Sequence, residues 1–139
     1  MIDISTIGDM SVSAFLGDVI ARVAPDASLE AVADALVSGE VGALVVGDGE
    51  RADGIVSERD IVRALAARRD PVTTHAIDIA TTVLVWCDAT ATVAEVAIEM
   101  MEEYVRHVLV EEDGRLVGIV SARDLLGAFA AATPESDED

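Results

Sequence analysis

The heptapeptide GIVSERD at residues 54–60 returns as GIVSARD at residues 118–124, so six of seven positions are identical 64 residues further along the chain. The same offset aligns further positions on both sides of the motif. Among them are Ala27 with Ala91, Ser28 with Thr92, Val32 with Val96, Val46 with Val110 and Arg51 with Arg115. A match sustained in this way indicates an internal duplication, which sets the organisation of the whole chain.

Each copy carries the same succession of apolar patterns, which predicts strand, helix, strand, strand and helix. The first helix of each copy is opened by Ser28 or Thr92 as N-cap, and the hairpin turns at Asp48-Gly49 or Asp113-Gly114. The apolar stripes expected to be buried on the four helices are Leu29, Val32, Ala33, Leu36 and Val37; Ile61, Val62, Leu65 and Ala66; Val93, Val96, Ala97, Met100 and Met101; and Leu125, Leu126, Phe129 and Ala130. The fold class is therefore α/β, of the α+β kind, with two β-α-β-β-α repeats.

The repeats define the expected domain boundaries. We expect an N-terminal segment at 1–17, a first repeat at 18–69, a linker at 70–81, a second repeat at 82–132 and an acidic, disordered tail at 133–139. One copy of about 50 residues buries too little apolar surface to fold well alone. We therefore expect the two sheets to pack together about a pseudo-twofold axis, with two clefts between the repeats.

Composition excludes several classes of protein. The formal net charge is −18, from 27 acidic residues against nine arginines, so nucleic acid and anionic membrane surfaces are disfavoured as partners. A high-salt cytoplasm and a codon-biased genome would both account for this acidity. No apolar stretch is long enough to cross a membrane, no secretory signal is present, and Cys87 is the single cysteine. These features predict a cytoplasmic protein.

The repeated motif combines groups that can recognise a ribose and a phosphate. A carboxylate in the first turn of a helix can accept hydrogen bonds from two vicinal hydroxyls. A serine N-cap and the free backbone N–H groups beside it can face a phosphate, and an arginine adds a cationic donor. These residues are Ser57 and Ser121, Arg59 and Arg123, and Asp60 and Asp124. Ser-x-x-Asp is also a helix-start signature, so the same residues have a structural role as caps.

The two motif copies, each preceded by the expected helix and hairpin, resemble tandem cystathionine-beta-synthase (CBS) domains, the paired Bateman module. The resemblance extends from about Leu16 to Ala130. It implies a module that binds AMP, ADP or ATP in the clefts and forms a homodimer. It further implies that Arg106 and His107 face phosphates, although the first copy has Gly42 and Ala43 at those positions.

By the same resemblance, the adenine lies against the chain near Val19 in one copy and near Thr82 and Val83 in the other. The leading hypothesis is a regulatory sensor of adenine nucleotides that signals to an effector protein in trans. The alternative is a structural homodimerisation module with unoccupied clefts. Enzymatic function has little support, since no nucleophile and base pair, Walker loop or dinucleotide fingerprint is present. No metal site or required cofactor is expected, because neither His75 nor His107 has partners at ligand spacing.

Overall fold

The computed structural model describes residues 4–16 and 20–131, which form two compact units. The first-motif unit is Val19–Leu84 and contains residues 54–60. The second-motif unit joins Met1–Asp18 to Val85–Asp139 and contains residues 118–124. The mixed α/β class expected from the sequence is confirmed, with one three-stranded sheet in each unit.

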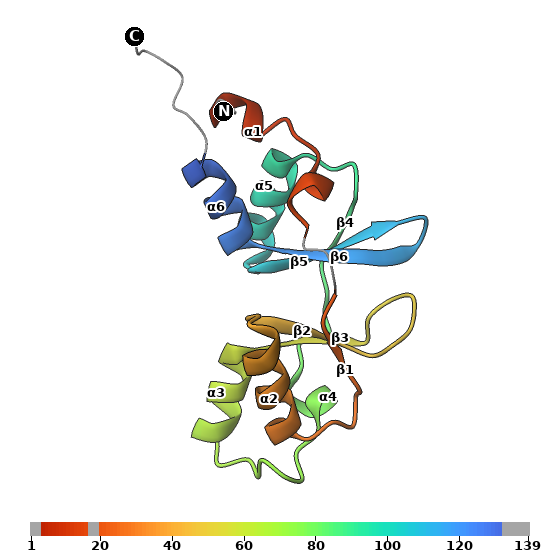
Figure 1. Ribbon diagram of the computed structural model, residues 1–139, viewed down its shortest axis with the longest axis vertical. Coiled ribbons are helices and arrows are strands. Elements are labelled where there is room, and N and C mark those ends of the chain that lie inside the picture. Colours follow the sequence, from red (N-terminus) through yellow and green to blue (C-terminus); the bar gives the residue numbers. More distant parts are fainter. Residues whose placement is uncertain (1–3, 17–19, 132–139) are drawn as a thin grey trace. The chain divides into compact units, whose positions relative to one another are not determined.

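The first-motif unit is a small sheet covered by helices on one face (Figure 1). Its elements are β1 (Arg22–Val23), α2 (Leu29–Gly39), β2 (Ala43–Val46), β3 (Gly54–Ser57), α3 (Glu58–Ala66) and α4 (Ala76–Ile79). The strand order is β1-β2-β3, with β1 parallel and β3 antiparallel to β2. Since α3 begins directly after β3, the strand delivers the motif serine to the start of the helix.

The second-motif unit repeats this plan with a longer hairpin (Figure 1). Its elements are α1 (Ile4–Ile7), the 3-10 helix η1 (Val12–Phe15), β4 (Trp86–Asp88), α5 (Val93–Glu103), β5 (His107–Glu112), β6 (Arg115–Ser121) and α6 (Ala122–Ala131). The strand order is β4-β5-β6, again parallel and then antiparallel. Asp113 and Gly114 form the hairpin turn with φ values of 54° and 79°, the left-handed conformation that favours aspartate and glycine there.

The segment in front of each repeat packs on the other copy. In the first-motif unit, the segment that leads into the second repeat supplies α4, and the amide of Ala76 donates to the carbonyl of Ala27 at 2.8 Å. The equivalent bond in the second-motif unit runs from Val12 to Ala91 at 2.7 Å. The stretch expected as a linker at 70–81 thus contributes a helix to the first-motif unit.

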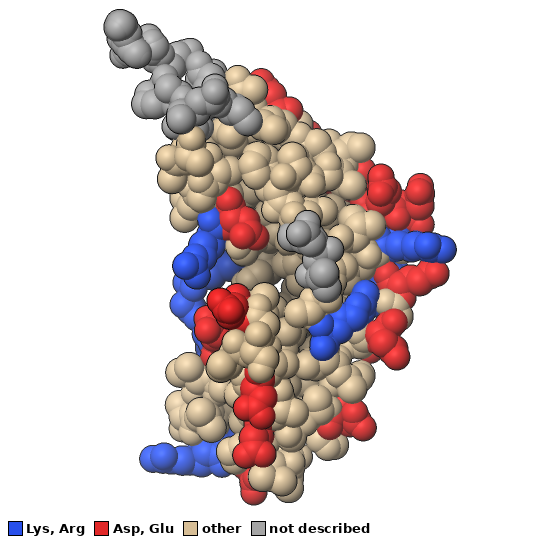
Figure 2. All heavy atoms as spheres, in the orientation of Figure 1, with Lys and Arg blue, Asp and Glu red and all other residues tan. Residues whose placement is uncertain are grey.

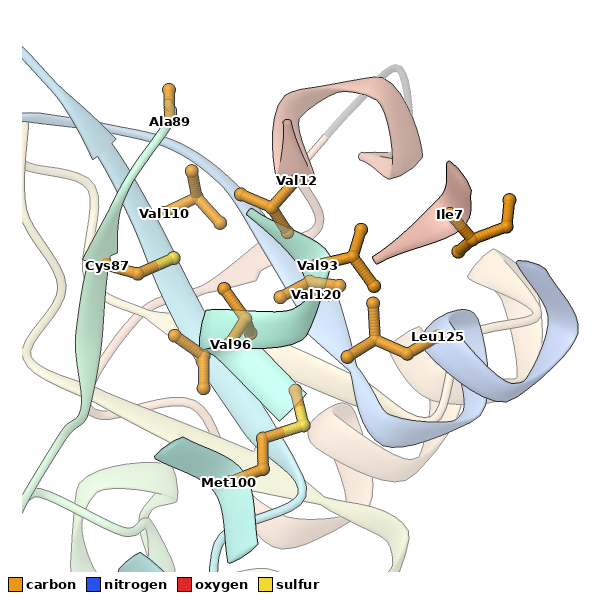
Figure 3. Packing of buried hydrophobic residues seen from close by; sticks show 11 residues of the cluster. Ile7, Val12, Cys87, Ala89, Val93, Val96, Met100, Val110, Val120 and Leu125 are labelled. Carbon is orange, nitrogen blue, oxygen red and sulfur yellow. The ribbon is translucent and has the colours of Figure 1, made fainter. Parts of the chain in front are cut away.

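The core of the second-motif unit forms where α5 and α6 lie on the sheet (Figure 3). Val93, Val96 and Met100 of α5 meet Val120 of β6 and Leu125 of α6. Ile7 and Val12 close the cluster from the N-terminal segment. The apolar stripe of α5, whose members lie three and four residues apart, holds this helix on the sheet.

Part of the burial expected on the helices is wrong. Seven apolar residues placed in the buried stripes are exposed, and they are Val37, Val62, Leu65, Ala66, Met101, Leu126 and Ala130. Successive residues on a helix are about 100° apart, so a residue next to a buried position is turned out of the core. Val37 follows the buried Leu36 in this way, and Met101 follows Met100.

The 27 acidic residues of the chain outnumber its nine arginines. Figure 2 shows aspartate and glutamate spread over the face in view, with arginines confined to a few groups. No helix among the described residues is long and apolar enough to cross a membrane.

Candidate functional site

The first motif forms a closed set of hydrogen bonds at the start of α3. The backbone N–H of Ser57 donates to Oδ2 of Asp60 at 2.8 Å, and the serine hydroxyl donates to the same oxygen at 3.1 Å. The amide of Asp60 donates back to the serine Oγ at 3.4 Å. Serine and aspartate thereby satisfy two N–H groups that the ends of strand and helix would otherwise leave open.

The second motif forms the same reciprocal pair of backbone-to-side-chain bonds at the start of α6. The amide of Ser121 donates to Oδ2 of Asp124 at 2.9 Å, and the amide of Asp124 donates to the serine Oγ, also at 2.9 Å. The capping role expected for both motifs is confirmed. Within the described part of the chain, these bonds engage only Oδ2 of each aspartate, which leaves Oδ1 as a charged acceptor for another molecule.

Asp60 lines a groove in the first-motif unit. The groove is open to solvent and has a volume of about 380 Å³, and it is lined by Asp60, Arg63, Ala64, Ala67, Arg69, Asp78, Ile79 and Thr81. The first five residues belong to α3 and the turn after it, while the last three come from α4 and the chain that follows. The volume falls within the range of about 300–1,000 Å³ that small-molecule sites occupy.

The glycine that opens the motif allows the second wall of this groove to approach. A Cβ placed on Gly54 would lie 3.0 Å from the carbonyl oxygen of Thr81 and 3.1 Å from Cβ of Ala80. Thr81 instead pairs with Ile55, donating to its carbonyl at 2.8 Å and accepting from its amide at 2.9 Å. The small residue therefore lets the segment after α4 lie beside β3.

The structure brings some of the predicted residues together and leaves others apart. Arg106 and His107 come to the start of the second motif, since the carbonyl of Arg106 accepts from Ala122 at 2.8 Å and His107 pairs with Ser121 across β5 and β6. Arg59 and Arg123 are exposed.

The adenine-binding residues expected from the resemblance lie differently. Thr82 and Val83 are exposed, and it is their neighbour Thr81 that lines the groove. Val19 lies outside the described residues.

Two arginines in the groove were missed by sequence reasoning. Arg63 lies three residues after Asp60, a spacing that puts both on one face of α3, and this signal could have found it. Arg69 is brought back by the helix end, where its amide donates to the carbonyl of Ala64 at 2.9 Å after Arg68 adopts a φ of 65°. No hydrogen bond or ion pair engages either guanidinium within the described residues.

The single cysteine is a poor nucleophile. Burial of Cys87, with the carboxylates of Glu99, Asp88 and Glu111 nearby, raises the pKa of its thiol to about 11. The thiolate, which is the reactive form, is therefore scarce at neutral pH.

Comparison with known proteins identifies relatives that match most of the chain. Hypoxic response protein 1 of Mycobacterium tuberculosis is 39% identical over 100 residues, which are 70% of this chain and 70% of that protein. A structure of hypoxic response protein I holds two coordinated zinc ions and matches with 33% identity and a TM-score of 0.72, over 85% of this chain and 98% of that one. In residues 4–16 and 20–131 of the present chain, no three His, Cys, Asp or Glu residues gather as metal ligands.

Two further solved structures carry adenosine-type ligands. A CBS domain protein from Pyrobaculum aerophilum, complexed with AMP, is 32% identical with a TM-score of 0.76, covering 88% of this chain and 100% of that one. A CBS domain pair complexed with 5′-methylthioadenosine and S-adenosyl-L-methionine is 26% identical with a TM-score of 0.76, covering 87% and 96% of the two chains. The family model for the CBS domain matches twice, at residues 12–67 and 76–131. The chain belongs to the CBS domain family and contains a CBS pair.

Proposed function

We propose that this CBS pair is a regulatory module that binds an adenine nucleotide at its two motifs, with Asp60 and Asp124 holding the ribose. The observation that carries the proposal is the second carboxylate oxygen of each aspartate. Oδ2 is used in the cap, whereas Oδ1 is left to accept from a ligand hydroxyl, and in the first copy the carboxylate lines a groove of about 380 Å³. The ligands of two structural neighbours share the adenosyl group, which supports this class of ligand.

The charge of the chain favours the smaller nucleotides. A formal charge of −18 repels a polyanion, and the repulsion is strongest at low ionic strength, where screening is weak. We therefore expect AMP or ADP to bind more tightly than ATP in the absence of a divalent cation. Adenine contacts by Val19, Thr82 and Val83, and phosphate contacts by Ser57, Arg59, Ser121, Arg123, Arg106 and His107, stay predictions.

Isothermal titration of the intact chain with AMP, ADP, ATP and S-adenosylmethionine tests the proposal. Asp60→Asn and Asp124→Asn keep an acceptor oxygen but remove the charge, so each should weaken binding at its own motif by about tenfold or more. The matched control is Glu95→Gln. Glu95 closes the same kind of capping box on α5, accepting from the amide of Thr92 at 2.9 Å.

All three substitutions should cost a similar, small amount of stability, about 0.5–1 kcal/mol, because each weakens one helix cap. Only the two motif variants should lose affinity. Absence of heat with all four ligands would contradict the proposal. So would a D60N/D124N variant that binds AMP as tightly as the unmodified chain.

A second candidate function, homodimerisation, is favoured by the exposed apolar residues. Val37 is 78% exposed and Val62 64% exposed, on α2 and α3. The residues 64 positions later, Met101 and Leu126, are 76% and 70% exposed on α5 and α6. Large apolar side chains repeated on the helices of both units suit burial against a second copy.

Sedimentation equilibrium of the M101E/L126E variant tests homodimerisation. We expect a dimer for the unmodified chain and a monomer for the variant. A monomeric unmodified chain would count against a dimer. Signalling to an effector protein in trans and a cytoplasmic location stay predictions of the sequence.

A further inference from the structure

We propose that Arg63 and Arg69 make the first motif's groove selective for an adenosine ligand that carries an anionic group, and that the second motif lacks this selectivity at the equivalent position. The inference rests on the proposed function. It goes beyond it by assigning the recognition of ligand charge to two residues that the motif itself does not contain.

Arg63 and Arg69 line the same groove as Asp60. Arg63 follows Asp60 by three residues on α3, which separates them by about 4.5 Å along the helix axis. Arg69 lines the same groove from the turn after the helix. A ligand whose ribose hydroxyls bind Asp60 therefore has cationic groups within the length of one nucleotide.

The groove is lined by side chains of both charges. Its lining contains two arginines and two aspartates, Asp60 and Asp78, in a chain whose formal charge is −18. Asp78 uses Oδ2 to accept from the amide of His75 at 3.1 Å, so one of its oxygens is committed to the start of α4. Neither guanidinium is held by a partner among the described residues, so both can reorient toward a phosphate.

The two copies differ at the position that Arg63 occupies in the first. In each unit the helix that follows the motif packs against the short helix of the segment before the other repeat. These pairs are α3 with α4 and α6 with η1. At the offset of 64, Gly127 stands where Arg63 stands, and Ala14 stands where Asp78 stands. A Cβ placed on Gly127 would meet nothing within 4 Å, so this position of α6 is open space. The second copy thus leaves space for a Cβ at this position but carries no side chain there.

The test compares AMP with adenosine, which differ only in the phosphate, in variants that keep one motif intact. In the D124N background, Arg63→Gln should lower AMP affinity by about tenfold or more while adenosine affinity stays the same. The salt dependence of AMP binding should weaken as well, since one charge contact is lost. Arg68→Gln is the matched control, because it makes the same charge change beside Arg69 but does not line the groove.

The reciprocal variant is Gly127→Arg in the D60N background, which should raise the ratio of AMP to adenosine affinity at the second motif. Equal losses of AMP and adenosine affinity in R63Q, or no loss of either, would overturn the inference. An unchanged affinity ratio in G127R would contradict the role of this helix position. Failure of the proposed function looks different, because neither adenosine nor AMP would then bind the unmodified chain.

Discussion

The glycine that opens each motif allows a paired test of how closely each unit is packed. A Cβ on Gly54 would lie 3.0 Å from the carbonyl oxygen of Thr81, a backbone atom held by hydrogen bonds to Ile55. A Cβ on Gly118 would lie 2.9 Å from Cδ1 and 3.0 Å from Cδ2 of Leu16. The first neighbour cannot move without breaking the pairing of two chain segments, whereas the second is the end of a side chain that can rotate.

The two substitutions should therefore differ in cost. Replacing glycine by alanine restricts the unfolded chain and is worth about 0.4–1 kcal/mol where the backbone conformation allows it. Overpacking against a neighbour that cannot yield costs about 1–3 kcal/mol. We expect Gly54→Ala to lower the free energy of unfolding by about 1–2 kcal/mol, and Gly118→Ala to change it by less than about 1 kcal/mol.

Urea denaturation measures the free energy of unfolding of each variant. Hydrogen exchange of the Ile55 and Thr81 amides shows whether the loss in Gly54→Ala arises at this backbone pairing. G54A should speed exchange at these amides and weaken AMP binding, since Thr81 lines the groove. Gly127→Ala serves as control, because its Cβ meets open space and the helix should gain about 0.5–1 kcal/mol. If Gly118→Ala costs as much as Gly54→Ala or more, the reasoning about the backbone contact is refuted.

Three other measurements test the packing and the ionisation states. The buried thiol of Cys87 should react slowly with a disulfide reagent at pH 8, and fast labelling of the folded protein at that pH would refute its burial. The free energy of unfolding should fall as the pH rises from the thiol's unfolded pKa, near 9.0, through its folded pKa of about 11, because only the unfolded chain loses the proton readily in that range. Val96→Ala, at a side chain that is 1% exposed, should cost about 1–3 kcal/mol in urea denaturation, and a cost below 0.5 would contradict a close-packed core. Tyr104→Gly should raise the melting temperature, because Tyr104 ends α5 with a φ of 57° that glycine adopts without strain; a lower value would show that the ring has a packing role.

Much of the fold could be predicted from the sequence because the decisive signals are local and occur twice. The N-caps Ser28 and Thr92 and the turn at Asp113-Gly114 each act within a few residues. The packing of the segment before each repeat on the other repeat could not be predicted. It depends on backbone bonds between distant residues, such as Val12 to Ala91, and the four residues of α4 are too few to show a helical period.

The candidate site was predicted only in part, for a similar reason. Ser57 and Asp60 were found because the motif repeats, whereas Arg63 was missed because the second copy has Gly127 in its place. Aligning the two repeats detects only residues that both copies share, so a functional residue present in one copy is overlooked. Arg69 reaches the groove through a left-handed turn at Arg68, which no pattern of apolar residues announces.

A crystal structure of the chain grown with AMP tests most directly whether Asp60 and Asp124 hold the ribose. We predict ribose hydroxyls within hydrogen-bonding distance of Oδ1 of Asp60, with the phosphate toward Arg63 and Arg69. Ribose density away from both Asp60 and Asp124, or motif aspartates that contact no ligand at saturating AMP, would contradict it.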